Sequence, residues 1–317
     1  MDSITQAALG AAIGHSLLSK KIGAKGAVVG AVVATVPDLD VILYLFYNKL
    51  DMLSIHRGFS HSLSFSILGA FLIAAILSRI KFFQSIRFKL LLLFSWLCLF
   101  THMLLDTFTA YGTQLYLPFS NKRIGFDSIN VVDPIYTIPL LIGLFLSLFV
   151  YNSKSDSTKY NTYGIVISSL YLIFTLVNKE IVNDKISARL NHEGIEYASL
   201  LSMPVGVANI NWYGVAKSQD SIYMFQHSIL SNFDSKIKAF PVNDEYLSLT
   251  EDYIADKMRW FAKGFYTVEK VDDKIRVYNL QVDMRGIIRE GKETYSTAGY
   301  FEISKNGDFS SGSHKTK

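Results

Sequence analysis

Long apolar runs in the first 178 residues predict a domain of membrane-spanning helices. Residues 58–78 contain no Asp, Glu, Lys or Arg over 21 positions, and residues 134–153 contain none over 20. Residues 160–178 and 90–105 lack these side chains over 19 and 16 positions. A helix crosses a bilayer core with about 20 apolar residues. Together with two segments rich in small residues, the runs predict six spans, at 3–19, 26–47, 60–78, 89–106, 134–152 and 160–178.

After residue 178 the pattern becomes that of a soluble domain. Helices are predicted at 180–193 and 245–260, and apolar–polar alternation predicts strands at 205–215, 222–229, 265–271, 275–282 and 297–303. Asp272-Asp273 is typical of a hairpin turn between two of these strands. The expected fold is therefore an α-helical multi-pass membrane domain (1–178), a small α+β soluble domain with a mainly antiparallel sheet (179–304) and a disordered tail (305–317).

Composition narrows the class of protein. Charged residues make up 18% of the chain, below the roughly 25% of a soluble globular protein, and the mean hydropathy is +0.25. This disfavours a fully cytosolic enzyme. One cysteine, Cys98, excludes a disulfide framework and a Cys-ligated zinc finger. A net charge of +4, spread along the chain, does not indicate nucleic-acid binding.

The loops between the six predicted spans differ in basic residues. One side of the membrane receives nine Lys and Arg residues and the other receives four, Lys49, Arg57, Lys122 and Arg123. The positive-inside rule makes the nine-residue side cytoplasmic. The N-terminus and the soluble domain are then expected on the side of the membrane opposite the cytoplasm. Seven of the eight acids in residues 1–178 fall on the same outer side.

Histidines join these acids at the outer ends of the predicted spans. The residues concerned are Asp2, Gln6, Asp38, Asp40, His56, His61, His102, Asp106 and Asp133. His102 and Asp106 are four apart, so a helix places both on one face. Imidazole and carboxylate groups without thiolates suit zinc or another first-row divalent ion. Ionisable groups at membrane depth are costly and usually mark function. The sequence therefore predicts a divalent metal site, with zinc as the favoured ion.

Simpler interpretations stay open for single residues. Asp38 and Asp133 flank prolines and are also typical of helix caps or turns. Arg57 is placed either to orient a phosphate or carboxylate or to reach the lipid head groups. His15, deep in the first span, is expected to be packed or to face a cavity rather than to join the site. His192 and His227 are expected to be surface histidines.

Several motifs in the first 150 residues carry a resemblance to a known family. They are MDSITQAALG (1–10), PDLD (37–40), HRGFSHS (56–62), THMLLD (101–106), TAYGTQ (109–114), PFS (118–120), Asp127 and Asp133-Pro134. In this order they resemble the bacterial inner-membrane metal-dependent hydrolases, a family also described as LexA-binding. The resemblance implies a multi-pass membrane protein with metal-dependent hydrolase activity. It maps ligand positions to Asp38, Asp40, His56, His61, His102 and Asp106. Gln6 and His15 depart from the family pattern, which has His and Glu there in many members.

The expected function is a membrane-bound hydrolase that uses a divalent metal. His56, His61, His102 and Asp106 are the predicted metal ligands, and Asp38, Asp40 and Arg57 are the predicted catalytic residues. Asp2, Gln6, Asp127 and Asp133 are weaker candidates for the same site. Expected partners are the lipid bilayer and a lipid or small phosphoester substrate, with no nucleic acid; no protein partner is indicated. The alternative is a non-catalytic binding or regulatory protein with a structural metal. A transporter is disfavoured, because the cytoplasmic side offers almost no intramembrane acid.

Overall fold

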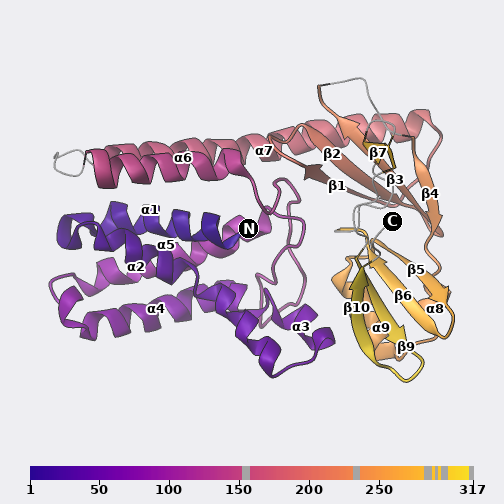
Figure 1. Cartoon of the computed structure of the whole chain (residues 1–317), viewed down its shortest axis with the longest axis horizontal. Coiled ribbons are helices and arrows are strands. Elements are labelled where there is room, and N and C mark those ends of the chain that lie inside the picture. Colours follow the sequence, from indigo (N-terminus) through magenta and orange to yellow (C-terminus); the bar gives the residue numbers. More distant parts are fainter. Residues whose placement is uncertain (152–157, 231–235, 282–287, 290–291, 294–298, 314–317) are drawn as a thin grey trace. The chain divides into compact units, whose positions relative to one another are not determined.

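A computed structural model describes the chain except for residues 152–157, 231–235, 282–287, 290–291, 294–298 and 314–317. The chain forms two compact units (Figure 1). Unit 1 comprises Met1–Leu45 and Ile55–Val177, and unit 2 comprises Phe46–Ser54 and Asn178–Lys317. The short segment Phe46–Ser54 therefore belongs with the C-terminal part of the chain, although the sequence predicted it as a loop of the membrane domain.

Unit 1 is helical. Its α-helices are α1 (Ser3–Ile22), α2 (Lys25–Ala34), α4 (Leu63–Arg79), α5 (Phe88–Thr107), α6 (Pro134–Phe145) and the first part of α7 (Thr158–His192). Short 3₁₀ segments lie at Pro37–Leu45 (η1), Phe59–His61 (η2) and Lys81–Phe83 (η3), and a π-helical turn, η4 (Leu146–Val150), continues α6. Helix α3 (Lys49–Ile55) lies between η1 and η2. Helix α7 begins in unit 1 and ends in unit 2.

Polar side chains at the helix starts explain where three helices begin. The carboxylate of Asp2 accepts the backbone N–H of Thr5, and that of Asp133 accepts the N–H of Ile135. The hydroxyl of Ser62 accepts the N–H of Phe65 at the start of α4. Each contact satisfies an amide that has no partner inside its helix. The capping interpretation of Asp133 is therefore the one that the structure supports.

Glycines allow α1 and α2 to pack with their backbones in contact. A Cβ atom at Gly30 would lie 2.0 Å from the carbonyl oxygen of Gly10, and one at Gly14 would lie 2.1 Å from that of Gly26. These pairs run in opposite directions along the two helices, so α1 and α2 are antiparallel. Small residues at such crossings are typical of helices in lipid, where close van der Waals packing drives association.

The expectation of six spans is not supported. Among the described residues, two helices, α5 and α7, are long and apolar enough to cross a membrane. Two bent pairs, Lys25–Ala34 with Pro37–Leu45 and Lys49–His61 with Leu63–Arg79, raise the number to four if each pair is one span. Their bends are 51° and 57°. Thr35 and Val36, before Pro37, interrupt the first pair, and Ser62 interrupts the second. Helix 134–150 is too short to count as a span, and helix 3–22 does not pass as an apolar span.

Unit 2 contains two four-stranded antiparallel sheets. The first has the order β1-β2-β3-β4, and the second has the order β10-β9-β6-β5 (Figure 1). The strands are β1 (Ser199–Val205), β2 (Asn211–Lys217), β3 (Ser221–Ser228), β4 (Lys238–Pro241), β5 (Tyr266–Val271), β6 (Lys274–Asn279), β9 (Gly299–Ser304) and β10 (Phe309–Ser313). A two-residue pair, β7 (Ile288–Arg289) and β8 (Lys292–Glu293), forms a separate ladder. Short helices α8 (Asp244–Leu247) and α9 (Asp252–Phe261) lie between β4 and β5.

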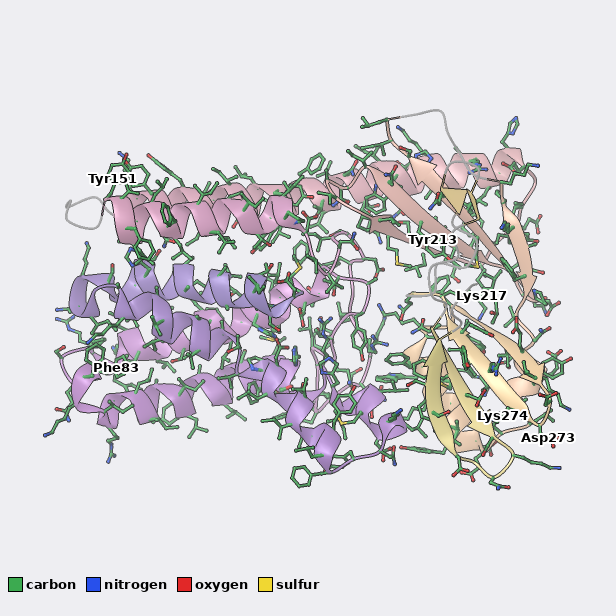
Figure 2. The ribbon with its side chains drawn as sticks, in the orientation of Figure 1. Phe83, Tyr151, Tyr213, Lys217, Asp273 and Lys274 are labelled. Carbon is green, nitrogen blue, oxygen red and sulfur yellow. The ribbon has the colours of Figure 1, made fainter. Side chains whose placement is uncertain are left out.

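Three details of the soluble part differ from the sequence expectations. The predicted strand 205–215 covers the last residue of β1, a turn and most of β2, because Gly206, Ala208 and Asn209 take positive φ angles and reverse the chain. The predicted helix 245–260 is broken between α8 and α9. The predicted tail contains β10, which pairs with β9, whereas 314–317 lie outside the described residues. Figure 2 labels Tyr213 and Lys217, which mark β2.

Candidate metal centre

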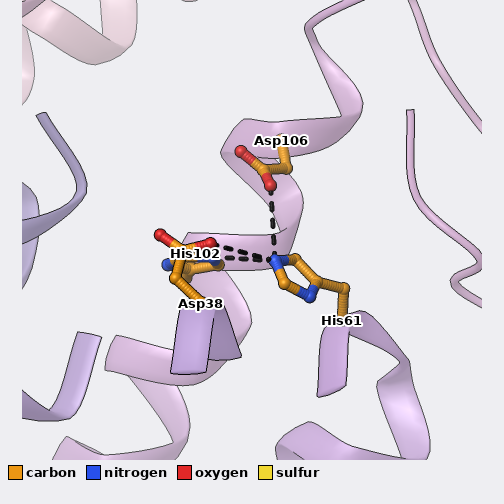
Figure 3. Close-up of side chains that lie close together, drawn as sticks. All are labelled: Asp38, His61, His102 and Asp106. Carbon is orange, nitrogen blue, oxygen red and sulfur yellow. Dashed lines mark hydrogen bonds and ion pairs between the residues drawn. The ribbon is translucent and has the colours of Figure 1, made fainter. Parts of the chain in front are cut away.

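Three separate segments of unit 1 bring four ligand-type side chains together. Asp38 lies on η1, His61 ends η2, and His102 and Asp106 lie one turn apart on α5. One nitrogen or oxygen atom from each side chain lies within 4.8 Å of the corresponding atoms of the others, so the group could hold a metal ion. Figure 3 shows these four side chains pointing toward one another.

The distances between the facing atoms are short. His61 Nε2 lies 3.2 Å from His102 Nε2, 3.4 Å from Asp38 Oδ1 and 3.5 Å from Asp106 Oδ2. His102 Nε2 lies 3.4 Å from Asp38 Oδ1. Three of the side chains are almost fully buried, whereas the side chain of Asp38 is 24% exposed. The group is therefore closed on the protein side and accessible next to Asp38.

Asp40 accepts hydrogen bonds from the turn that carries His56 and His61. Its Oδ2 accepts the backbone N–H of Arg57 at 2.9 Å and the hydroxyl of Ser60 at 3.0 Å. The Ser60 hydroxyl lies 2.9 Å from His61 Nδ1, the ring nitrogen that faces away from the group of four. A partner on the outer nitrogen of a ligand histidine fixes its ring orientation and tautomer. Asp40 therefore positions His61 and does not contribute one of the four facing atoms.

His56 does not join the group of four, although the sequence predicted it as a ligand. Its Nδ1 lies 2.9 Å from Asp40 Oδ1, and its ring centroid is 6.3 Å from that of His61. Four-residue helical spacing brought His102 and Asp106 together, but the HRGFSHS motif is a turn, with Arg57 at a φ of 55°. In this turn His61 faces the group and His56 faces Asp40.

Arg57 is buried beside the site. Its Nε lies 3.1 Å from Asp106 Oδ2, and its Nη1 donates to the Thr109 hydroxyl at 3.3 Å. Its Cζ lies 4.9 Å from the centroid of the Tyr111 ring. The structure therefore supports a position at the site for Arg57 and not the alternative in which it reaches the lipid head groups.

The weaker candidates divide into two kinds. Gln6 lies at the site, where its Nε2 donates to Asp106 Oδ1 at 3.0 Å and to the backbone carbonyl of His102 at 3.1 Å. The Met1 amino group also forms an ion pair with Asp106. Asp2 and Asp133 are helix caps, and Asp133 Oδ2 also accepts the Tyr171 hydroxyl.

Two further positions lie away from the group of four. Asp127 lies in the loop between α5 and α6, where it takes a φ of 50°. His15 is buried in α1, and its ring nitrogens have no hydrogen-bond partner among the described residues.

Sequence reasoning missed Tyr111 and Arg123 as members of the site's surroundings. The Arg123 guanidinium donates to the Tyr111 backbone carbonyl, and its Cζ lies 4.4 Å from the Tyr111 ring centroid. Burial lowers the pKa of Arg123 to about 10, with the nearby Arg57 charge acting in the same direction and Tyr111 and Asp127 opposing it. In the sequence, Arg123 counted only as one basic loop residue, and no spacing linked it to the histidines.

The four facing atoms fit a divalent cation. With zinc–ligand distances of about 2.0–2.1 Å, a tetrahedral site has ligand–ligand edges of roughly 3.3–3.4 Å. The four edges given above lie between 3.2 and 3.5 Å. Asp106 Oδ2 is buried, and although Arg57 Nε lies 3.1 Å away, it accepts no hydrogen bond within the described part of the chain. The same region also brings two imidazole nitrogens and a second carboxylate together. A cation at the centre would satisfy all four atoms.

The apolar helices and the enclosed His/Asp group define a class: membrane proteins with a buried His/Asp group that could hold a metal ion. Residues 1–182 match the family model described as "YdjM inner membrane protein". Because this match covers more than half of the chain, the protein belongs to the YdjM inner membrane protein family. All four residues of the group lie within the matched region.

Two relatives agree with this assignment. The chain is 32% identical over 180 residues to YfhP of Bacillus subtilis, described as uncharacterized, with 55% of this chain and 53% of YfhP covered. It is 35% identical over 122 residues to the inner membrane protein YbcI of Escherichia coli, with 38% of this chain and 69% of YbcI covered. The chain thus matches about half the length of YfhP. No solved structure matches it.

Proposed function

We propose that the protein is a membrane-bound hydrolase that depends on a divalent metal, held by Asp38, His61, His102 and Asp106. The observation that carries the proposal is the set of four facing atoms, all within 4.8 Å of one another and with four of their six separations at 3.2–3.5 Å. Two imidazoles and two carboxylates suit zinc among the first-row ions. When bound, such an ion supplies Lewis-acid polarisation of the scissile bond and acidifies water.

The chain's own residues then have distinct roles. Asp38 is the partly exposed member of the group, so it is placed to orient a water molecule and accept its proton. Arg57 lies behind Asp106 and supplies positive charge for an anion that develops at the site. Asp40 keeps His61 in position through Ser60. The expected substrate is a phosphoester or a lipid-related ester.

A second candidate function has its own observation. The four side chains come from η1, η2 and α5, with Asp38 and His61 23 positions apart and His61 and His102 41 positions apart in sequence. A metal between them would tie these segments together even without catalysis. The protein would then be a membrane binding or regulatory protein, the class to which the LexA-binding description of the resembling family belongs.

The deciding experiment measures metal and hydrolysis on the same samples. We expect near-stoichiometric metal in detergent-purified wild type by elemental analysis, and loss of most of it in His61→Ala, His102→Ala and Asp106→Asn. His227→Ala, a histidine of β3 in unit 2, is the matched control and should keep its metal. Hydrolysis of generic phosphoesters and carboxylesters by wild type supports the enzyme. Bound metal without turnover favours the structural role, and metal-free, folded wild type that cannot be reloaded rejects both.

We also propose an orientation. Counted over the six spans predicted from sequence, the nine-to-four bias of basic residues favours the extracytoplasmic side for the His/Asp group. The structure supports two to four candidate spans, and a change in their number moves loops between the two sides, so the orientation proposal depends on the six-span topology. Reporter fusions test this: a fusion after Lys25 should report the cytoplasm and one after Lys317 the outside. A cytoplasmic C-terminus would contradict the orientation and leave the site unchanged.

A further inference from the structure

Two arginines share one tyrosine ring next to the His/Asp group. The Cζ atoms of Arg57 and Arg123 lie 4.9 Å and 4.4 Å from the centroid of Tyr111. Both arginine residues are 8% exposed. Cations stack favourably on aromatic faces, and the ring holds each guanidinium in a fixed plane. The arrangement holds two positive charges against one ring, and one of them, Arg57, also lies 3.1 Å from Asp106 Oδ2.

The contacts of Arg57 leave one nitrogen of its guanidinium group available to bind a ligand. Its Nε is beside Asp106 and its Nη1 donates to Thr109, whereas its Nη2 has no hydrogen bond among the described residues. A guanidinium carries five N–H donors in a planar fork that matches the oxygens of a phosphate. An anion between Arg57 and the His/Asp group would accept a hydrogen bond from Arg57 Nη2. Its negative charge would also reduce the repulsion between the two arginines.

The segment that carries Asp38 turns apolar side chains outward. Within η1, Pro37 and Asp40 are buried, whereas Leu39, Val41, Ile42, Tyr44 and Leu45 are exposed, Leu45 by 81%. Phe59, on the neighbouring η2, and Phe119, in the loop after α5, are also exposed, Phe119 by 91%. In water so many adjacent exposed apolar side chains would be unfavourable, but in a membrane protein they are expected to contact lipid.

We propose that Arg57 and Arg123, stacked on Tyr111, form the binding site for the phosphate of a membrane lipid that reaches the His/Asp group along η1. The proposal rests on the proposed function and specifies its substrate class: an amphiphile with a phosphate head group, and not a water-soluble phosphoester. The acyl chains stay against the apolar side of η1 while the phosphate lies between the arginines and the group of four.

The test measures lipid binding to the full-length protein. Purified protein in neutral-detergent micelles is titrated with phosphatidic acid, with phosphatidylcholine and with soluble glycerol phosphate, and binding is followed by native mass spectrometry and thermal shift. We expect wild type to bind phosphatidic acid at least tenfold more tightly than either of the other two. Arg57→Lys and Arg123→Lys keep the charge but lose the planar fork, so each should weaken this binding about tenfold.

Arg79→Lys is the matched control, because Arg79 ends α4 at the opposite end from Ser62 and the site. It should leave lipid binding unchanged. Equal affinity for phosphatidic acid and phosphatidylcholine, or no effect of the two site variants, overturns the phosphate site. Glycerol phosphate that binds as tightly as phosphatidic acid overturns the lipid source.

A second measurement does not require the buried arginines to be changed. Cys98 is fully buried, so spin labels attached to Leu45→Cys and Phe119→Cys variants report those two positions alone. In lipid nanodiscs both labels should collide more often with oxygen, which concentrates in lipid, than with a water-soluble nickel chelate. The reverse preference at both positions overturns the route along η1.

The two proposals fail differently. Tight phosphatidic acid binding without hydrolysis of any ester rejects the enzyme and supports the lipid site. Hydrolysis of a soluble phosphoester with no preference for phosphatidic acid rejects the lipid site and supports the enzyme. Metal content is measured on every sample and shows whether an arginine variant has also disturbed the His/Asp group. If it has, the Tyr111→Leu variant, which removes the shared ring, is tested in place of that arginine variant.

Discussion

The two units of this protein place polar and apolar residues in opposite ways. Unit 1 buries His61, His102 and Asp106 and exposes large apolar side chains along its helices, such as Ile67 and Ile173. Unit 2 buries Trp212 and other apolar side chains around its strands and α7. The same physical chemistry explains both, because exposed apolar residues are favourable in lipid and buried ones are favourable in water. Buried ionisable groups are thus a structural feature of unit 1 that demands a functional reason.

The two units also differ in what brings their elements together. In α1 and α2 of unit 1, glycines let two backbones touch. In unit 2 the elements are strands joined by backbone hydrogen bonds and covered by α7, whose Val182, Ile186 and Leu190 are buried with Trp212. Unit 1 should therefore be more sensitive to added volume at its glycines than unit 2.

The largest expected effect is on the α1–α2 contact. In Gly30→Val, the new Cβ would lie 2.0 Å from the Gly10 carbonyl oxygen and 3.0 Å from the Gly14 Cα, both of which are backbone atoms. The two helices must separate, so we expect a loss of about 3 kcal/mol or more in stability. Thermal unfolding in detergent and the yield of monodisperse protein measure the effect.

Gly299→Val in β9 is the matched control from unit 2. A Cβ at Gly299 meets nothing within 4 Å, and valine is well suited to a strand. This variant should stay within about 0.5 kcal/mol of wild type. If Gly30→Val unfolds at the same temperature as Gly299→Val, the glycine contact does not determine the packing of unit 1.

Apolar runs located the helices of unit 1 well but not their number as membrane spans. The runs at 89–106 and 160–178 correspond to α5 and to the apolar part of α7. The segment 26–47 is as apolar overall, yet it bends by 51° where Thr35 and Val36 separate α2 from η1. Hydropathy measures the composition of a segment and is insensitive to such a break. Similarly, no local pattern indicated that Phe46–Ser54 belongs with unit 2, where Asp51 accepts the Tyr253 hydroxyl.

At the site, residue chemistry was easier to predict than role. The helical spacing of His102 and Asp106 and the histidines at the span ends pointed to His61, His102 and Asp106, whereas Asp38, the fourth member of the group, was predicted as a catalytic residue and was a ligand position only through the family resemblance. The distinction between His61 and His56 depends on the turn at Arg57, and the position of Arg123 depends on a long loop. The turn and the loop conformation are both set by tertiary structure. The sequence motif alone therefore does not distinguish His56 from His61.

The next largest effect concerns Asp40, which tests whether the site depends on its surroundings as well as on its four facing atoms. Asp40→Asn removes a charge that accepts the Arg57 N–H and the Ser60 hydroxyl. His61 would then be held less firmly. Changes of this kind typically cost 10–100-fold in metal affinity, so we expect a loss in that range, measured by competition with a chelating dye.

Asp2→Asn provides the comparison for Asp40. Asp2 caps α1 through the Thr5 amide, and asparagine is an equally good cap. Metal affinity should stay at the wild-type value in this variant. An equal loss in both variants would mean that general loss of negative charge, and not the support of His61, sets the affinity.

The smallest expected effect tests the electrostatics of unit 2, which lie on its surface. Arg259 donates to both carboxylate oxygens of Asp244, at 3.1 Å and 3.0 Å, and the Tyr266 hydroxyl also donates to Asp244. Burial acts to raise the pKa of Asp244, but the hydrogen bonds and the Arg259 charge outweigh it and hold the pKa below its ordinary value. The same contact, after burial, helps to raise the pKa of Tyr266 to about 12.

A carboxyl group whose pKa is lower in the folded state stabilises the fold above its unfolded pKa of about 3.9 and loses this effect as the pH falls through its folded pKa. Because the Asp244 side chain is 45% exposed, solvent limits the gain to about 0.5–1 kcal/mol. Asp244→Asn should therefore lower the unfolding temperature of unit 2 at pH 7 by a small amount and leave it unchanged near pH 2. The fluorescence of Trp260, which is next to Arg259 in the sequence, follows the unfolding transition.

Asp273→Asn is the control, since Asp273 has no ion pair in the part of the chain that the structure describes. A difference between wild type and Asp244→Asn that is constant from pH 7 to pH 2 would show that the lost hydrogen bonds, and not the charge, account for the stabilisation.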